Sequence, residues 1–281
     1  GSDKDYGWLQ PSDINQHPAV HLLTTLVRTW RWWTGYGYDT PGVRCNWPGL
    51  GGNSLYAGQI YMADSQKWSE DVASHEYGHH WVSSYASSPM PGYCNGHCDT
   101  SAPLNCGHCW WCEETSGVAF TEGFPDWMGD VIPGSFAANY GRAAYSIYNF
   151  EELSQCCEAS GCYWGDPWMT EGFLAAVVRD IGDSTNDDHA FFSETDELSV
   201  GYAAAITCVD LDAPVTAGAF LTAFKNRYPA YREGLWATAM NCGYYIDIAT
   251  PPAVTGLSSP SHTAGGTSAD PTIELAWTRA V

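Results

Sequence analysis

The chain has 281 residues, of which 44% are hydrophobic and 14% aromatic, enough apolar surface for one large domain or two smaller ones. Its formal charge is −21, from 32 acidic and 11 basic residues, and such a surface repels nucleic-acid phosphates and anionic lipids. No run approaches the roughly 18 apolar residues of a membrane helix. We therefore expect a soluble protein without a nucleic-acid partner or a membrane span, with a monomer favoured.

In chain order, helical spacing of apolar residues predicts helices at 17–33, 69–85, 116–130, 167–181, 215–228 and 231–240. The alternating stretch LYAGQIYMAD, residues 55–64, predicts a strand. The Gly-, Pro- and Asn-rich region 34–56 is expected to be loop. Residues 88–112, which carry five cysteines, are expected to form an irregular insert.

The composition changes at residue 250, where TPPAVTGLSSPSHTAGGTSADPTIELAWTRAV begins. This segment opens on a Pro-Pro linker and ends on an alternating strand, and it resembles the first strands of a bacterial fibronectin type III-like module. Because about 30 residues cannot close a β-sandwich of about 100, we expect it to be the start of a longer domain. The predicted organisation is one large domain at 1–250 and a linker with a truncated β-sandwich at 251–281.

Cysteine usage predicts a secreted protein. There are eleven cysteines, many for a cytosolic protein of this size, and all but Cys45 lie between positions 94 and 242. We expect several disulfides, whose connectivity the sequence does not give, and one cysteine left over. Gly1-Ser2 resembles the remnant of a cleaved tag, so any export signal is expected outside this sequence.

The stretch DVASHEYGHHWVSS contains an H-E-x-x-H motif, from His75 to His79. On a helix, residues four apart lie about 40° apart around the axis and about 6 Å along it, so both imidazoles can face one cation. Glu76 can lean over the metal without binding it and act as a general base. His80 is rotated away and is expected to have a packing or surface role. The alternative is a polar helix face, since chance gives this pattern in on the order of 1 in 100 chains of this length.

A catalytic zinc has three protein ligands and one open position. The metzincin spacing is excluded, because Val82 and Tyr85 stand where it requires Gly and His. The stretch TEGFPDWMGD instead offers Glu122 and, four residues later, Asp126. Glu122 could bind the metal, and Asp126 could accept the free N–H of a ligand histidine.

Two features complicate the choice of Glu122. The tetrapeptide TEGF recurs at 170–173, so Glu171 is a rival ligand, although an acid at the fourth position follows Glu122 alone. Pro125 would kink a helix that begins near residue 116, but it would be tolerated in the first turn if Thr121 were the N-cap.

The order strand, H-E-x-x-H helix and E-x-x-x-D helix resembles the gluzincin zinc metallopeptidases, nearest to thermolysin-like and fungalysin-like enzymes, over about half the chain. The resemblance implies Zn²⁺ bound by His75, His79 and Glu122, with Asp126 as second-shell carboxylate, and an endopeptidase that cleaves peptide or protein substrates with Glu76 as general base. It implies a two-lobed α+β zincin-like fold, in which a small mixed sheet has its edge strand above the motif helix. The C-terminal lobe would be mainly helical, with disulfide-stapled loops.

The same resemblance places a substrate-binding edge strand at GGNSLYAGQIYMAD, residues 51–64, with Asn53 as a candidate contact. In this family a Tyr or His stabilises the oxyanion. The candidates here are Tyr163, His189, Tyr145 and Tyr148, each of which also has a structural interpretation.

Two other segments carry metal-binding residue types. DIGDSTNDDHAFFSETDE, residues 180–197, is either a Ca²⁺ site or a solvated acidic loop. CNGHCDTSAPLNCGHCWWC, residues 94–112, is either a metal knuckle or, as its composition favours, a loop stapled by disulfides. Two alternative functions also stay open, a binding or adhesion module with a vestigial zinc site and a metallopeptidase restricted to glycoproteins.

Overall fold

The fold comes from a computed structural model, which divides the chain into two compact units, Gly1–Ile246 and Asp247–Val281. The structure describes residues 17–49, 51–86, 110–111, 113–148, 150, 156–157, 161–162, 166–185, 196 and 198–246. The predicted β-sandwich segment, residues 251–281, lies outside the described residues, as does most of the cysteine-rich insert.

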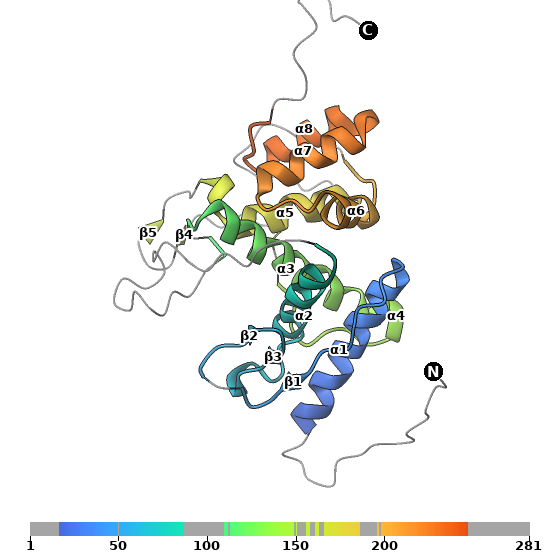
Figure 1. The fold of residues 1–281 in the computed structure, drawn as a ribbon, viewed down its shortest axis with the longest axis vertical. Coiled ribbons are helices and arrows are strands. Elements are labelled where there is room, and N and C mark those ends of the chain that lie inside the picture. The colour runs from blue at the N-terminus through green and yellow to red at the C-terminus, as the bar shows by residue number, and fades with distance from the viewer. Residues whose placement is uncertain are drawn as a thin grey trace, which may run out of the picture. The chain divides into compact units, whose positions relative to one another are not determined.

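Helices form most of the first unit, which is a mixed α+β structure. The helices are α1 His17–Gly35, α2 Glu70–Tyr85, α3 Ser116–Gly134, α4 Phe136–Tyr140, α5 Glu171–Gly182, α6 Tyr202–Asp212, α7 Ala217–Arg227 and α8 Arg232–Asn241 (Figure 1). Within the described part of the chain, no single helix is long and apolar enough to cross a membrane, although the bent pair α6 and α7 meets that test jointly.

A small mixed sheet packs near α2. It has the order β1-β3-β2, with β1 (Cys45–Asn46) parallel and β2 (Leu55–Tyr56) antiparallel to β3 (Ile60–Tyr61). A second, two-stranded antiparallel sheet pairs β4 (Cys156–Cys157) with β5 (Gly161–Cys162).

Each of the six predicted helices has an observed counterpart, but the strand and loop predictions were partly wrong. Residues 55–64 form a hairpin instead of one strand, because Gly58, with φ +71°, reverses the chain between β2 and β3. Strand β1 lies in a region predicted as loop. Helix α6 was missed, as was the short α4.

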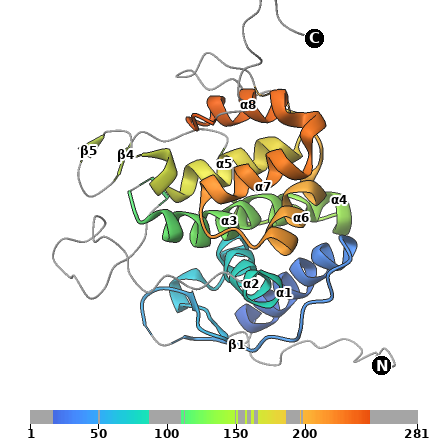
Figure 2. The same cartoon turned by 45° about the horizontal axis from the view of Figure 1, so that its top comes forward.

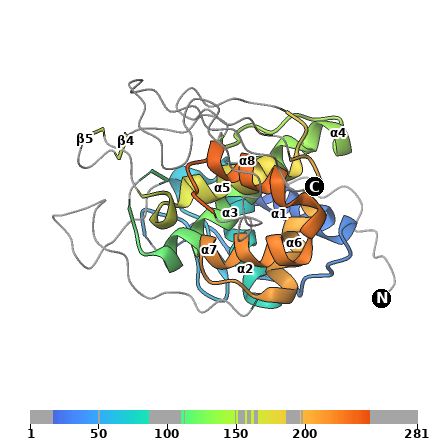
Figure 3. The same ribbon diagram turned by 90° about the horizontal axis from the view of Figure 1, so that it is seen from above.

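Helix α3 is the central element of the helical part. It lies between α2 and α5, as Figure 2 shows, and α7 and α8 lie in front of α3 and α5 in the view from above (Figure 3). Two glycines permit these close approaches. A Cβ on Gly78 of α2 would lie 2.6 Å from Met128 Sδ and 3.0 Å from Pro125 Cα, and a Cβ on Gly123 would overlap the carbonyl oxygen of Glu171. The mid-helix cost of Gly78, about 1 kcal/mol relative to Ala, is therefore offset by close packing.

The structure decides between the two expectations for Pro125. Helix α3 begins at Ser116, and its N-cap is Thr115, whose Oγ1 accepts a hydrogen bond from the Val118 N–H at 3.2 Å. Pro125 is therefore inside the helix, and Thr121 is not the N-cap. Because proline has no N–H, the carbonyl of Thr121 lacks its usual helical donor at this turn.

The expectation of one leftover cysteine was wrong. Cys45, Cys208 and Cys242 are all free thiols. The side chains of the other eight lie outside the described residues. Cys208 and Cys242 are buried among helices, where a cysteine packs as a small apolar residue. Cys242 Sγ donates to Asp180 Oδ2 at 2.9 Å.

Asp180, on α5, generates a prediction for stability. Burial raises the pKa of its carboxyl to about 8, and nearby Asp196 and Asp183 add to the rise. The folded protein therefore keeps a proton on Asp180 that the unfolded chain, with a pKa of about 3.9, releases, so stability falls as pH rises from about 4 to 8. Asparagine cannot ionise. In Asp180→Asn we therefore expect the free energy of unfolding to decline less between pH 4 and pH 8 than in the wild type, with a difference of a few kcal/mol.

Urea denaturation between pH 5 and pH 8 measures the effect. Asp64→Asn, at an exposed surface position, is the matched control and should leave the slope unchanged. An Asp180→Asn slope equal to that of the wild type would show that Asp180 is already ionised in the folded protein.

Candidate metal centre

Three side chains from two helices converge on one point. His75 Nε2 and His79 Nε2, one turn apart on α2, are 3.1 Å from each other. Glu122 Oε2, from α3, lies 3.3 Å from His75 Nε2 and 3.0 Å from His79 Nε2. This His/His/Glu group could hold a metal ion.

The spacing of the three atoms fits a tetrahedral ion. An ion with bonds of about 2.0–2.1 Å holds its ligand atoms about 3.3–3.4 Å apart. The observed separations, 3.0 to 3.3 Å, reach that value or fall slightly below it. Two imidazole nitrogens and one carboxylate oxygen also leave one of four positions for a further ligand.

Asp126 orients one of the two imidazoles. Its Oδ1 lies 2.8 Å from His75 Nδ1, and its side chain is fully buried. The contact holds the proton of the neutral ring on Nδ1, so the lone pair of Nε2 faces the metal position. Burial alone would lower the pKa of His75, but the carboxylates of Asp126, Glu122 and Glu76 raise it well above its ordinary value. This excess of negative charge favours a bound cation.

The rival carboxylate, Glu171, is not part of the metal-binding group. It is the first residue of α5, it is fully buried, and its carbonyl oxygen lies against Gly123 of α3. Helix α5 packs on the side of α3 that faces away from α2 (Figure 2), and the charge of Glu171 helps to raise the pKa of Tyr148.

His80 has the structural role expected for it. Its Nε2 lies 2.7 Å from the carbonyl oxygen of Pro41, and its Nδ1 lies 3.2 Å from the hydroxyl of Tyr56. These contacts attach the chain before β1 and strand β2 to the motif helix. They bring the sheet beside the metal-binding group, where the rings of Tyr56 and His79 are nearly parallel at 6.4 Å.

Among the residues that the structure describes, strand β2 has no partner on the side away from β3, so it presents an open edge here. Ile60 and Met62 donate to β1, so the backbone of Tyr61 faces β2 and pairs with Leu55. The N–H and C=O of Tyr56, the next residue, therefore point away from β3. Asn53, the predicted substrate contact, is exposed and lies two residues before β2.

Glu76 is buried beside the metal-binding group without belonging to it. Its charge raises the pKa of both His75 and Tyr148, which places the carboxylate near both. This is the position that the motif predicts for a group that acts next to the metal.

Tyr148, like Tyr56, is a described tyrosine whose ring lies close to a histidine of the metal-binding group. Its ring centroid lies 6.3 Å from that of His75 in an edge-on arrangement. A Cβ on Gly129 would come within 2.8 Å of the Tyr148 ring, so this glycine makes room for it on α3. Burial, then the charges of Asp126 and Asp71, raise the pKa of Tyr148 well above its ordinary value. Its hydroxyl therefore keeps its proton and stays a hydrogen-bond donor.

The loop that carries Tyr148 is tied to the start of α2. The buried carboxylate of Glu70 accepts from Arg142 Nη1 at 2.7 Å and from the backbone N–H of Tyr145. Ser146 Oγ donates to Asp71 Oδ1 at 2.9 Å and lies 3.0 Å from the Glu70 nitrogen. Local sequence spacing does not reveal this clamp, because 75 residues separate Glu70 from Tyr145 and Asp71 from Ser146.

None of the other three oxyanion candidates is placed beside the metal-binding group by the described part of the structure. Tyr145 is 73% exposed and packs on the guanidinium of Arg142, so it has a surface role. Tyr163 and His189 lie outside the described residues. So does most of the proposed calcium segment, and the part of the chain that the structure describes contains no second metal-binding group of this kind.

Comparison with known proteins adds no assignment: neither a protein-family model nor a curated protein matches the chain.

The choice between the two glutamates can be tested by metal binding. We expect Glu122→Gln to weaken Zn²⁺ affinity by more than about 100-fold, because it removes a charge that would bind the ion directly. Asp126→Asn should weaken affinity by about 10–100-fold, and Glu171→Gln should leave it unchanged. Competition with a chromophoric chelator measures each dissociation constant.

Circular dichroism of each variant controls for folding. Loss of affinity in folded Glu171→Gln, with normal affinity in Glu122→Gln, would reverse the assignment.

Proposed function

We propose that this chain is a Zn²⁺-dependent endopeptidase of the gluzincin type. One observation carries the proposal: His75, His79 and Glu122 meet within 3.3 Å of one another, with Asp126 behind His75. Two nitrogen ligands and one carboxylate with an open position are the donor set of catalytic zinc in hydrolases. The order of motifs along the chain supports the same family.

The zinc ion would supply a Lewis acid that polarises a peptide carbonyl and activates water. Glu76 takes a proton from the attacking water and passes it to the leaving amine. It suits this role because it follows His75 directly on the same helix, about 100° around the axis, so its carboxylate would lie beside a bound ion without binding it. Asp126 keeps the Nε2 of His75 directed at the metal throughout.

Tyr148 is our candidate for the donor that stabilises the oxyanion. Its hydroxyl keeps its proton, its ring contacts His75, and its loop is fixed to α2 by Glu70. A donor held rigidly before reaction stabilises developing charge without the cost of reorganisation.

The open edge of β2 supports a peptide as substrate. The outward N–H and C=O of Tyr56 can pair with an extended backbone that passes the metal-binding group. In this arrangement α1, α2 and the sheet would form one lobe and α3 with the later helices the other. The proposal also includes an extracellular location and disulfides in the cysteine-rich loops, which rest on the cysteine content of the chain.

The general base gives the main test. Glu76→Gln should keep the fold and the Zn²⁺ affinity within a few fold but lose nearly all peptide hydrolysis, because the amide cannot accept the proton. Cleavage of a quenched fluorescent peptide library, with Glu233→Gln on α8 as control, measures this. Near-normal hydrolysis by Glu76→Gln would refute the mechanism, and tight zinc binding by a wild type that cleaves nothing would favour a vestigial site.

Tyr148 and Tyr145 form a matched pair on one loop. Tyr148→Phe removes one hydroxyl and should lower kcat by about 100-fold or more with a smaller change in KM, because the hydrogen bond forms in the transition state. Tyr145→Phe, at the exposed position, should leave both constants unchanged. Equal kinetics for the two variants would assign the oxyanion donor elsewhere.

A further inference from the structure

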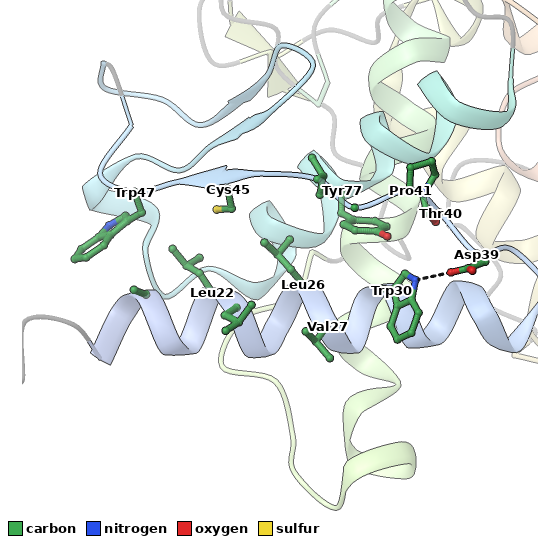
Figure 4. Close-up of a pocket in the computed structure, with 14 residues that line it drawn as sticks. Leu22, Leu26, Val27, Trp30, Asp39, Thr40, Pro41, Cys45, Trp47 and Tyr77 are labelled. Carbon is green, nitrogen blue, oxygen red and sulfur yellow. Dashed lines mark hydrogen bonds between the residues drawn. The ribbon is translucent and has the colours of Figure 1, made fainter. Parts of the chain in front are cut away.

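A second concave site lies between α1 and the segment that leads into β1. It is a groove of about 580 Å³, a volume within the range of ligand-binding pockets. Figure 4 shows Leu22 and Leu26 of α1 facing Cys45 and Trp47 across it, with Tyr77 of α2 at its back. None of the residues that line it belongs to the metal-binding group.

The rim of the groove is an apolar surface that a helix in a folded protein usually buries. Leu23 is 57% exposed and Val27 is 37% exposed, and both line the groove from α1. Trp30, one turn further along α1, is also exposed. Contiguous apolar surface beside a hollow is typical of a protein-binding site.

Strand β1 offers unpaired backbone groups beside this surface. Arg44 O and Asn46 O accept from β3, so the N–H and C=O of Cys45, between them, point to the other side of the strand. Among the described residues Cys45 has no other backbone partner there. An open strand edge is a template for a further strand.

The groove has one charge. Asp39 is the sole charged side chain among the 14 residues that line the groove, and its Oδ1 lies 3.3 Å from Trp30 Nε1. The chain as a whole carries −21. A basic ligand is therefore attracted to this groove and an acidic one is repelled.

We propose that the groove binds an extended, basic peptide segment of another protein, which adds as a strand to the free edge of β1. Alternate side chains of that segment lie on Leu23 and Val27 of α1, and a Lys or Arg lies near Asp39. Backbone hydrogen bonds supply affinity, while the apolar surface and the single acid supply selectivity.

The test uses the full chain with Glu76→Gln and the capped peptide Ac-Val-Lys-Val-Thr-Val-Lys-NH₂. We expect a dissociation constant in the micromolar range by calorimetry, with a change in tryptophan fluorescence from Trp30 or Trp47. A peptide with Glu in place of Lys should bind at least tenfold more weakly. So should a peptide that is N-methylated at alternate residues, because it cannot pair with β1.

Variants of the exposed rim locate the binding. Leu23→Glu should weaken binding at least tenfold, while the same substitution at Leu211, which is 61% exposed on α6, should have no effect. His79→Ala should still bind the peptide, which separates this site from the metal centre. Hydrolysis of the peptide library should also survive Leu23→Glu in the otherwise wild-type chain.

Several outcomes would overturn the proposal. They are absence of binding, equal binding by Leu23→Glu, and equal binding of the N-methylated peptide. Binding that appears only after removal of residues 1–16 would make the occupant a segment of this chain. Self-association that Leu23→Glu abolishes would make it a second copy.

Discussion

The close crossing of α2 and α3 is the constraint on which the metal-binding group depends. Gly78 lies next to His79 on α2, and Pro125 lies next to Asp126 on α3, at the point where the two helices touch. Because Gly78 has no side chain, the two helices can approach to the distance at which Glu122 reaches both imidazoles. Any Cβ at residue 78 would meet Met128 and Pro125 and push the helices apart, and separations of 3.0 to 3.3 Å tolerate little expansion.

The same crossing of α2 and α3 also brings buried acidic side chains close to His75 and Tyr148. The carboxylates of Asp126, Glu122 and Glu76 raise the pKa of His75, and those of Asp126, Asp71, Glu76 and Glu171 raise the pKa of Tyr148. A cation at the His/His/Glu group lowers the electrostatic cost of burying them. One further acid, Glu70, has its own cation in Arg142, which also fixes the loop before Tyr148.

The sequence predicted what depends on local spacing. The motif helix, the two histidines of the metal-binding group, and Glu122 in preference to Glu171 all follow from residues four apart on one helix. What depends on distant contacts was missed. Local spacing does not distinguish Tyr148, our proposed oxyanion donor, from the three other candidates. Its loop is positioned by a distant contact, in which the N–H of Tyr145 donates to Glu70, 75 residues earlier. The hairpin at Gly58, strand β1 and the three free cysteines depend likewise on packing between separate segments.

The small sheet has a consequence beyond either of its neighbouring sites. Within the described part of the chain, β3 is the one strand of this sheet that is paired on both sides, so the sheet can grow outward in two directions. A chain added to β2 would lie by the histidines, and one added to β1 would lie over α1. Two ligands on opposite borders would then share a five-stranded ribbon with the short strand β3 at its centre, and His80, which contacts Pro41 and Tyr56, would be a second connection between them.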